Sequence, residues 1–298
     1  GGDCLNTGCV PSKALLRSAK FVAQAARAQS LGIGSAKVEF EFRDVMERVQ
    51  RVVDSIAPHD SAERYTKLGV ECIQGEAKIV SPWAVEVKSA TDSRTLTTRA
   101  IVIAAGARPF VPRIPGLEEV GYVTSDTLWD LRELPERLVV LGGGPIGCEL
   151  TQAFARLGSR VTQVEMLPRI MMREDPEVSE MVMSRFREED IDVRVDTEAK
   201  RFLVEEGEKL LVAKHQGREL RIPFDALLIA VGRVANTAGY GLEDLGISPT
   251  KGPTLEVNAY MQTGYPNIYA CGDVAGPYQF THTAAHTAWY ASVNALFG

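Results

Sequence analysis

A cluster of glycines between two segments of different pattern constrains the fold of this chain more than any other feature. The apolar run 138–141 comes directly before the glycine-rich segment 142–147, and the helix-forming stretch 146–157 overlaps its end. A second strand-like run, 160–165, comes next. Strands that alternate with helices in this way are typical of a parallel sheet covered by helices. We therefore expect an α/β fold.

The glycine-rich segment fits the pattern G-x-G-x-x-G, with Gly142, Gly144 and Gly147 in the glycine places. In this pattern the first glycine permits a tight turn, the second lets a pyrophosphate approach the backbone, and the third lets the helix pack on the strand. The helix N-terminus offers N–H groups and a positive dipole to phosphate. A glycine turn that only packs is the alternative, but the flanking strand and helix favour a dinucleotide site.

An acidic residue, Glu165, ends the second strand of this unit. At that distance from the glycines, a carboxylate is expected to accept hydrogen bonds from the adenosine ribose hydroxyls. Its charge would repel a 2′-phosphate, so we predict NAD(H) in preference to NADP(H). Arg169 lies only a few residues further on and acts against this preference, because an arginine can accommodate the extra phosphate.

The other elements are predicted from apolar periodicity. Helical patterns cover 12–26, 42–68, 176–189 and 281–296, and strand patterns cover 71–73, 77–80, 83–87, 95–98, 100–106, 226–232 and 267–270. The short strands between 71 and 98 are expected to form an antiparallel meander. The runs 101–106 and 227–232 both pass from an apolar strand through alanine to glycine, with an arginine soon after, which indicates two related domains.

Two of the five cysteines, Cys4 and Cys9, lie close together, whereas Cys72, Cys148 and Cys271 stand in isolated apolar or glycine-rich settings. The spacing of the close pair would suit a zinc site, but such a site needs further ligands nearby. The histidines are too scattered to supply them: His59, His215, His282 and His286. We therefore predict no metal site.

A redox role for Cys4 and Cys9 has physical support. The pair lies at the predicted start of a helix, with Pro11 in the first turn, and a helix dipole stabilises a thiolate there. Lys13 adds a positive charge one turn beyond Cys9. Inert buried thiols are the alternative. The sequence therefore favours a redox-active pair.

The overall charge restricts the partners. The formal net charge of -6 argues against nucleic acid and against anionic membranes as partners. No apolar run is long enough to cross a bilayer, and no basic segment followed by an apolar stretch is visible at the start. We expect a cytoplasmic protein.

The opening stretch from Gly1 to Lys13 resembles the active-site signature of the class I pyridine nucleotide–disulfide oxidoreductases, the group of lipoamide dehydrogenase, glutathione reductase and mercuric reductase. That signature reads G-G-T/S-C-x-N-x-G-C-x-P-S-K, and the chain departs from it at Asp3. Other stretches resemble family motifs and follow in family order: 102–106, 142–149, 232–237 and 268–273. In the third of these, Ala235 replaces a proline.

This resemblance implies two Rossmann-like domains. Residues 1–124 and 254–298 would bind FAD, and residues 125–253 would bind NAD(P). The resemblance also implies cofactor contacts beyond the glycine turn and Glu165, namely at Gly106, Gly232, Gly272 and Asp273. The aspartate would bind the ribityl and phosphate region of the flavin.

The resemblance further implies a route for electrons. NADH would deliver hydride to the flavin, and the reduced flavin would pass two electrons to the Cys4–Cys9 disulfide. Cys9 would be the flavin-proximal thiol, and Cys4 the interchange thiol that attacks the acceptor. Lys13 would lie near the reactive nitrogen of the flavin with Glu149 as its carboxylate partner, which would tune the flavin potential. A plain surface ion pair is the alternative for these two residues.

Family members also carry an upstream glycine unit for FAD and a C-terminal dimerisation domain with a His-Glu dyad, and we expect both to lie outside these residues. We therefore expect the chain to bind NAD(H), to hold FAD weakly or not at all, and to lack disulfide reductase turnover. The alternatives are an inert nicotinamide-binding module and a flavin electron carrier with structural cysteines. The full-length protein would be a homodimer. Its acceptor could be a small-molecule disulfide, a protein disulfide or a metal ion such as Hg(II).

Overall fold

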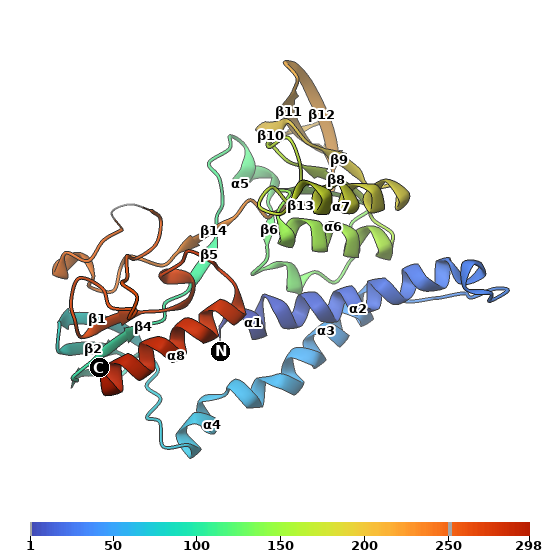
Figure 1. The fold of residues 1–298 in the computed structure, drawn as a ribbon. Coiled ribbons are helices and arrows are strands. Elements are labelled where there is room, and N and C mark those ends of the chain that lie inside the picture. The colour runs from blue at the N-terminus through green and yellow to red at the C-terminus, as the bar shows by residue number, and fades with distance from the viewer. Residues whose placement is uncertain (1, 250–251) are drawn as a thin grey trace. The chain divides into compact units, whose positions relative to one another are not determined.

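The computed structural model describes residues 2–249 and 252–298, which form two compact units (Figure 1). The first unit consists of Gly1–Ser61 and Pro109–Gly232, and the second of Ala62–Arg108 and Arg233–Gly298. Each unit has its own sheets and its own buried clusters. The expected α/β class is confirmed.

A five-stranded parallel sheet lies at the centre of the first unit, with the order β6-β13-β7-β8-β9. Its strands are β6 Val123–Thr124, β7 Arg137–Leu141, β8 Arg160–Val164, β9 Asp192–Arg194 and β13 Ala226–Ile229. The central strands are buried because helices or further strands cover both faces, which explains the unbroken apolar runs in the sequence.

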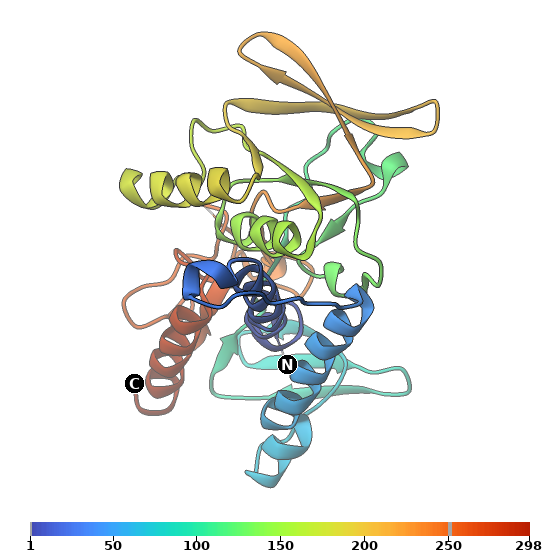
Figure 2. The same cartoon turned by 90° about the vertical axis from the view of Figure 1, so that its right-hand side faces the viewer.

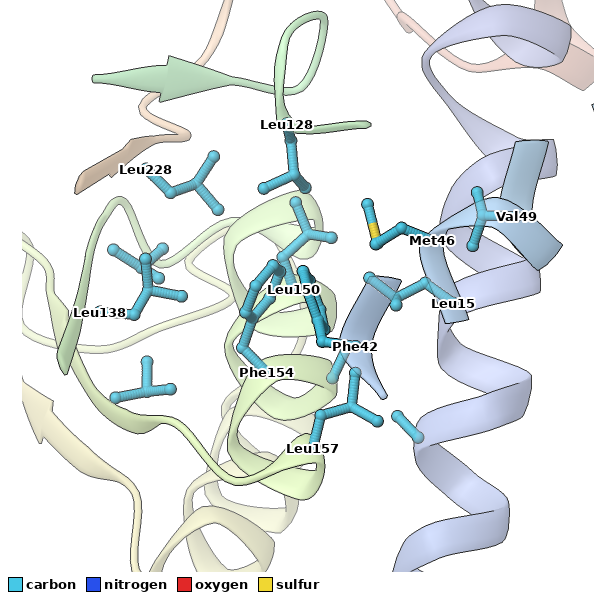
Figure 3. Close-up of a cluster of buried hydrophobic side chains, with 14 of the residues drawn as sticks. Leu15, Phe42, Met46, Val49, Leu128, Leu138, Leu150, Phe154, Leu157 and Leu228 are labelled. Atoms are coloured by element: carbon cyan, nitrogen blue, oxygen red, sulfur yellow. The ribbon is translucent and has the colours of Figure 1, made fainter. Parts of the chain in front are cut away.

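Helices from two distant parts of the chain pack in this unit. They are α1 Asp3–Asn6, α2 Cys9–Ala26, the 3-10 turn η1 Ala28–Leu31, α3 Phe42–Ile56, α6 Pro145–Leu157 and α7 Pro176–Glu188. Leu15 of α2 and Phe42 and Met46 of α3 share one buried cluster with Phe154 of α6 and with Leu138 of the sheet (Figure 3). The cysteine-bearing segment is therefore part of the same core as the glycine turn.

An antiparallel layer covers part of the parallel sheet. It consists of β10 Thr197–Glu205, β11 Glu208–His215 and β12 Arg218–Phe224, seen as a long curled ribbon in gold in Figure 2. Both tight turns of this ribbon place two residues at positive φ, Glu206-Gly207 and Gln216-Gly217, as two-residue hairpins require. Phe202 and Phe224 of the ribbon meet edge to face in a cluster with Val139 of the central sheet. The short helix α5 Leu117–Val120 and the 3-10 turn η3 Leu128–Asp130 complete the unit.

The second unit contains the expected meander, formed by β1 Glu76–Ser81, β2 Ala84–Lys88 and β3 Ser93–Thr97. Strand β4 Ile101–Ile103 pairs in parallel with β15 Ile268–Ala270, and β5 Ala107–Pro109 pairs with β14 Arg233–Ala235. The remaining elements are α4 Ala62–Lys67, the 3-10 turns η4 Glu243–Leu245 and η5 Gly272–Val274, and α8 Thr281–Phe297.

Two sequence-based expectations for local structure are wrong. The continuous helix over 42–68 is broken, because α3 ends at Ile56, a 3-10 turn η2 Ala57–Asp60 follows, and α4 is separate. Pro58 lacks a backbone N–H and disfavours a helical residue before it, which explains the break. The stretch 71–73 forms no strand. Its side chains are exposed, so no buried face holds it in a sheet.

The compact units do not coincide with the division predicted by cofactor. That division assigns 1–124 to a flavin domain, whereas Gly1–Ser61 packs with the parallel sheet and α6. The physical reason is the shared core of α2, α3 and α6. The cofactor-based domains, 1–124 with 254–298 and 125–253, remain a prediction.

Candidate functional site

The two close cysteines lie on consecutive helical segments of the first unit. Cys4 is in the single-turn helix α1, and Cys9 is the first residue of α2. The backbone N–H groups of Thr7 and Gly8 both donate to the Asp3 carbonyl, over 2.9 and 2.6 Å. A Cβ atom at Gly8 would lie only 2.9 Å from the Asp3 oxygen and 3.5 Å from the Cys4 Cα. Glycine at position 8 therefore lets the chain fold back onto Cys4 just before Cys9.

The start of α2 gives Cys9 a distinctive electrostatic environment. Cys9 is the first residue of an 18-residue helix, and its N-cap residue Gly8 has no side chain that could cap the first turn. The free N–H groups of a first turn carry positive partial charge and favour an anion nearby. Both Cys4 and Cys9 are half-buried. The pair therefore lies, partly exposed, near the N-terminus of α2.

Lys13 and Glu149 form the ion pair predicted for them. The Lys13 Nζ lies 2.8 and 2.7 Å from the two Glu149 carboxylate oxygens, joining α2 to α6. The two side chains are 60% and 37% exposed, so the pair stabilises the fold by about 1 kcal/mol or less. Its main physical effect is to place a compensated charge between the cysteine helix and the glycine turn.

The three glycines of the turn have different surroundings. A Cβ at Gly142, whose φ is 109°, would lie 2.2 Å from the Ala230 oxygen, and a Cβ at Gly147 would lie 2.2 Å from the Gly142 oxygen. At Gly144 no atom lies within 4 Å of the Cβ position. Two glycines thus serve internal packing, and the third leaves open space at the N-cap of α6. The roles of Gly142, Gly144 and Gly147 toward a pyrophosphate stay a prediction.

Glu165 is held beside this turn by both of its carboxylate oxygens. The Gly143 N–H donates to Oε2 over 2.5 Å, and the Leu167 N–H donates to Oε1 over 2.8 Å. Arg169, in contrast, turns into its own loop, because its guanidinium donates to the carbonyls of Met171, Met172 and Glu174. The acid therefore borders the turn, while the arginine is occupied by backbone.

A buried polar pair, Gln163 and Cys148, bonds two carbonyls of the glycine turn. Gln163 was not predicted from the sequence. Gln163 Nε2 donates to the Gly142 carbonyl over 2.9 Å and to the Cys148 sulfur over 3.6 Å. The Cys148 thiol donates to the Gly143 carbonyl over 3.4 Å. Burial raises the pKa of Cys148 from 9.0 to about 11, which excludes it as a nucleophile near neutral pH. No sequence signal singles out Gln163, because β8 also contains Arg160 and Thr162.

The second unit brings together the predicted flavin-contacting residues. Gly106 follows β4 and Gly272 follows β15, and these two strands pair in parallel. Both glycines have positive φ, 67° and 71°. Asp273 comes next and lies with its Oδ2 3.7 Å from the Arg233 Nε, both side chains being largely buried. The carboxyl ends of paired parallel strands are a common location for ligands.

The segment after Gly232 clamps the turn at Gly106. Asn236 donates from Nδ2 to the Ala105 carbonyl and from its backbone N–H to the Gly106 carbonyl, each over 2.9 Å. Arg108 donates to the Asn236 Oδ1, also over 2.9 Å. Gly232 itself adopts φ 131° at the end of the first unit, and its carbonyl accepts from the Phe110 N–H. The motif 232–237 therefore shapes the backbone of the site in the second unit.

Two features are absent from the described ranges, 2–249 and 252–298. No group of three or more histidine, cysteine, aspartate or glutamate side chains there is arranged to hold a metal ion. No helix in the same residues has the length and apolarity needed to cross a membrane.

Known proteins resemble this chain over nearly its whole length. Residues 1–288 match the family described as pyridine nucleotide-disulphide oxidoreductase. The chain is 38% identical to the mercuric reductase of Streptomyces lividans, over 100% of this chain and 63% of that protein. It is 34% identical to the mercuric reductase of Lysinibacillus sphaericus, over 100% of this chain and 54% of that protein. It is 32% identical to a dihydrolipoyl dehydrogenase of Bacillus subtilis, over 99% of this chain and 64% of that protein.

Two solved structures also resemble this chain over nearly its whole length. The HOCl-induced flavoprotein disulfide reductase RclA from Escherichia coli superposes with a TM-score of 0.84 at 28% identity, over 100% of this chain and 62% of RclA. LpdA from Mycobacterium tuberculosis gives a TM-score of 0.87 at 26% identity, over 99% of this chain and 64% of LpdA. The chain thus spans between 54% and 64% of the length of these relatives.

Proposed function

Because this chain belongs to the pyridine nucleotide–disulphide oxidoreductase family, we propose that it takes part in passing electrons from NADH, by way of FAD, to the Cys4–Cys9 pair and on to a disulfide or related acceptor. One observation carries the proposal. The cysteine helix α2 and the glycine-turn helix α6 share a buried core, and the Lys13–Glu149 pair joins them. Two motifs that are far apart in the sequence therefore belong to one unit.

NADH is the proposed electron donor. The open space at Gly144 and the N-terminus of α6 would receive the pyrophosphate. Glu165, held beside the turn, would accept hydrogen bonds from the adenosine ribose. The NADH preference is supported by the position of Arg169, since its donors are occupied by three backbone carbonyls and not directed at a phosphate.

FAD fits the second unit on the chemistry of its residues. Gly106 and Gly272 would let the flavin approach the backbone, and Asp273 would bind its ribityl and phosphate region. When bound, FAD supplies a two-electron relay between a hydride donor and a disulfide. The role of Lys13 near the reactive nitrogen of the flavin, with Glu149 as its carboxylate partner, stays a prediction from the resemblance.

The two thiols take different parts in the proposed reaction. The Cys4–Cys9 disulfide accepts two electrons and two protons to give a dithiol. The Cys4 thiolate then attacks the acceptor disulfide and releases one thiol, and Cys9 attacks the resulting mixed disulfide and releases the second. The sum is NADH, one proton and RSSR giving NAD⁺ and two RSH.

The test is anaerobic oxidation of NADH by the complete protein with FAD bound, with lipoamide, an aromatic disulfide or Hg(II) as acceptor. We expect oxidation that depends on an acceptor and is lost in both Cys4→Ser and Cys9→Ser. Cys72→Ser is the matched control, since Cys72 is exposed and lies in the other unit. NADH binding without oxidation would contradict the proposal and support an inert nicotinamide-binding module instead.

Comparing the acceptors also tests a second candidate. The mercuric reductases among the relatives favour Hg(II) as acceptor, whereas the dihydrolipoyl dehydrogenases favour a lipoamide-type disulfide. A preference for Hg(II) over lipoamide would assign the chain to the first branch. The homodimer proposed for the complete protein is tested separately by light scattering.

A further inference from the structure

Trp129 donates a hydrogen bond into the loop between the two cysteines. Its indole Nε1 lies 3.1 Å from the Thr7 carbonyl oxygen and 2.7 Å from the Ser125 carbonyl oxygen. Trp129 belongs to the turn η3, is half-buried, and packs against the cluster that contains Leu15. The indole thus packs on the core and shares its single proton between Ser125, which directly follows β6, and the loop between the two cysteines.

The carbonyl that accepts the Trp129 hydrogen bond belongs to the loop between the two cysteines. Thr7 lies between Cys4 and Cys9, and its N–H and that of Gly8 both point back to the Asp3 carbonyl. These two bonds are internal to the loop and move with it. The bond from Trp129 comes from a residue 122 positions further along the chain, so it fixes the Thr7 peptide relative to the core.

A disulfide makes strict demands on such a loop. The two Cα atoms must come within roughly 4.4–6.8 Å of each other in a suitable orientation. A loop that is already ordered loses less conformational entropy when the bond forms, which raises the effective concentration of one thiol at the other. The bond from Trp129 is formed while both cysteines are free thiols, so it orders the intervening peptide before the disulfide closes and thereby favours closure.

We infer that Trp129 is a positioning residue for the redox pair, whose indole N–H holds the Thr7 peptide and thereby stabilises the Cys4–Cys9 disulfide relative to the dithiol. This inference rests on the proposed redox function of the pair. It assigns to Trp129 no contact with the acceptor or with a cofactor.

The test is equilibration of the purified chain with glutathione. Oxidised glutathione takes two electrons from the thiols of Cys4 and Cys9, giving the internal disulfide and two reduced glutathione molecules, to which the two thiol protons pass. After acid quenching and alkylation, trypsin releases Cys4 and Cys9 together, because Lys13 is the first lysine or arginine of the chain. Mass spectrometry of that peptide gives the equilibrium constant without any bound cofactor.

Trp129→Phe removes the donor and keeps an aromatic ring. We expect its equilibrium constant for disulfide formation to fall by about three- to tenfold, the range for losing one hydrogen bond. Leu131→Ala is the matched control, since Leu131 packs on the same cluster and makes no bond to Thr7. Trp83→Phe, in the exposed part of the meander, controls for the substitution type. Both controls should stay within about twofold of the parent, as expected for changes that leave the anchoring bond in place.

An unchanged or increased constant in Trp129→Phe, or an equal fall in Leu131→Ala, overturns the inference. Failure of the proposed function looks different. In that case the parent chain itself forms no Cys4–Cys9 disulfide at any glutathione ratio, or replacing either cysteine leaves NADH oxidation intact.

Discussion

Gln163 and Cys148 show how single residues shape the glycine turn without meeting a ligand. Gln163 is fully buried in β8, and its partners on the two neighbouring strands are Val140 and Val193. Its Nε2 bonds the Gly142 carbonyl, and Cys148 bonds the Gly143 carbonyl. Because two successive carbonyls accept these hydrogen bonds, the peptide planes of the turn have little freedom to rotate. The open side at Gly144 is the side proposed for phosphate.

The buried thiol leads to a prediction about pH. The pKa of Cys148 is raised from 9.0 to about 11, so its neutral form is favoured in the folded state. That stabilisation is complete below about pH 9 and is lost as the pH rises through about 11. Between these values the parent should lose about 2–3 kcal/mol of unfolding free energy that Cys148→Ala does not lose. Urea unfolding across this pH range measures it.

The exposed Cys72 provides the control for this measurement. Cys72→Ala should keep the pH dependence of the parent. Equal slopes for the parent and Cys148→Ala between pH 9 and 11 would show that the Cys148 thiol does not titrate as described.

At the level of elements, the main finding is the packing of α2 and α3 against α6. Apolar positions on α2 were predicted from their helical spacing, and the structure buries Ala14, Leu15 and Ala19 completely or nearly so. The helical spacing of these apolar residues does not show which element they contact, because any apolar helix face has the same spacing. The break at Pro58 has a local cause, namely the missing backbone N–H of proline. One continuous helix was predicted because the apolar pattern continues on both sides of Pro58.

This interface leads to a prediction about stability. Leu15 is fully buried in the cluster shared by α2 and α6. Leu15→Ala should lower the unfolding free energy by about 2–5 kcal/mol, because it removes buried methyl groups and leaves a cavity. Phe21→Ala, on the same helix at 56% exposure, should cost about 0.5 kcal/mol or less. Denaturant unfolding of the two variants compares them, and similar losses would contradict the packing.

At the level of the whole molecule, the chain forms two units that carry different predicted ligand sites. The glycine turn, Glu165 and the cysteine pair belong to the first, and Gly106, Gly272 and Asp273 belong to the second. A ligand that binds one unit stabilises mainly that unit against local opening.

Hydrogen exchange provides the test at this scale. Addition of NADH should slow amide exchange most in the first unit, around 142–170, and leave the meander of the second unit unchanged. Addition of FAD should slow exchange around Gly106 and Gly272. Protection by NADH that is confined to the second unit would contradict the assignment of the glycine turn as its site.

The sequence by itself determined the glycine turn, the helix that begins at the cysteines, the meander and the family, because each depends on residues close together in the chain. It also predicted the Lys13–Glu149 pair, through resemblance alone. Only the tertiary structure decided that Gly1–Ser61 packs with the parallel sheet, that Gln163 supports the turn, and that Trp129 bonds the cysteine loop. These contacts join distant segments, and they depend on how helices and strands pack rather than on local pattern.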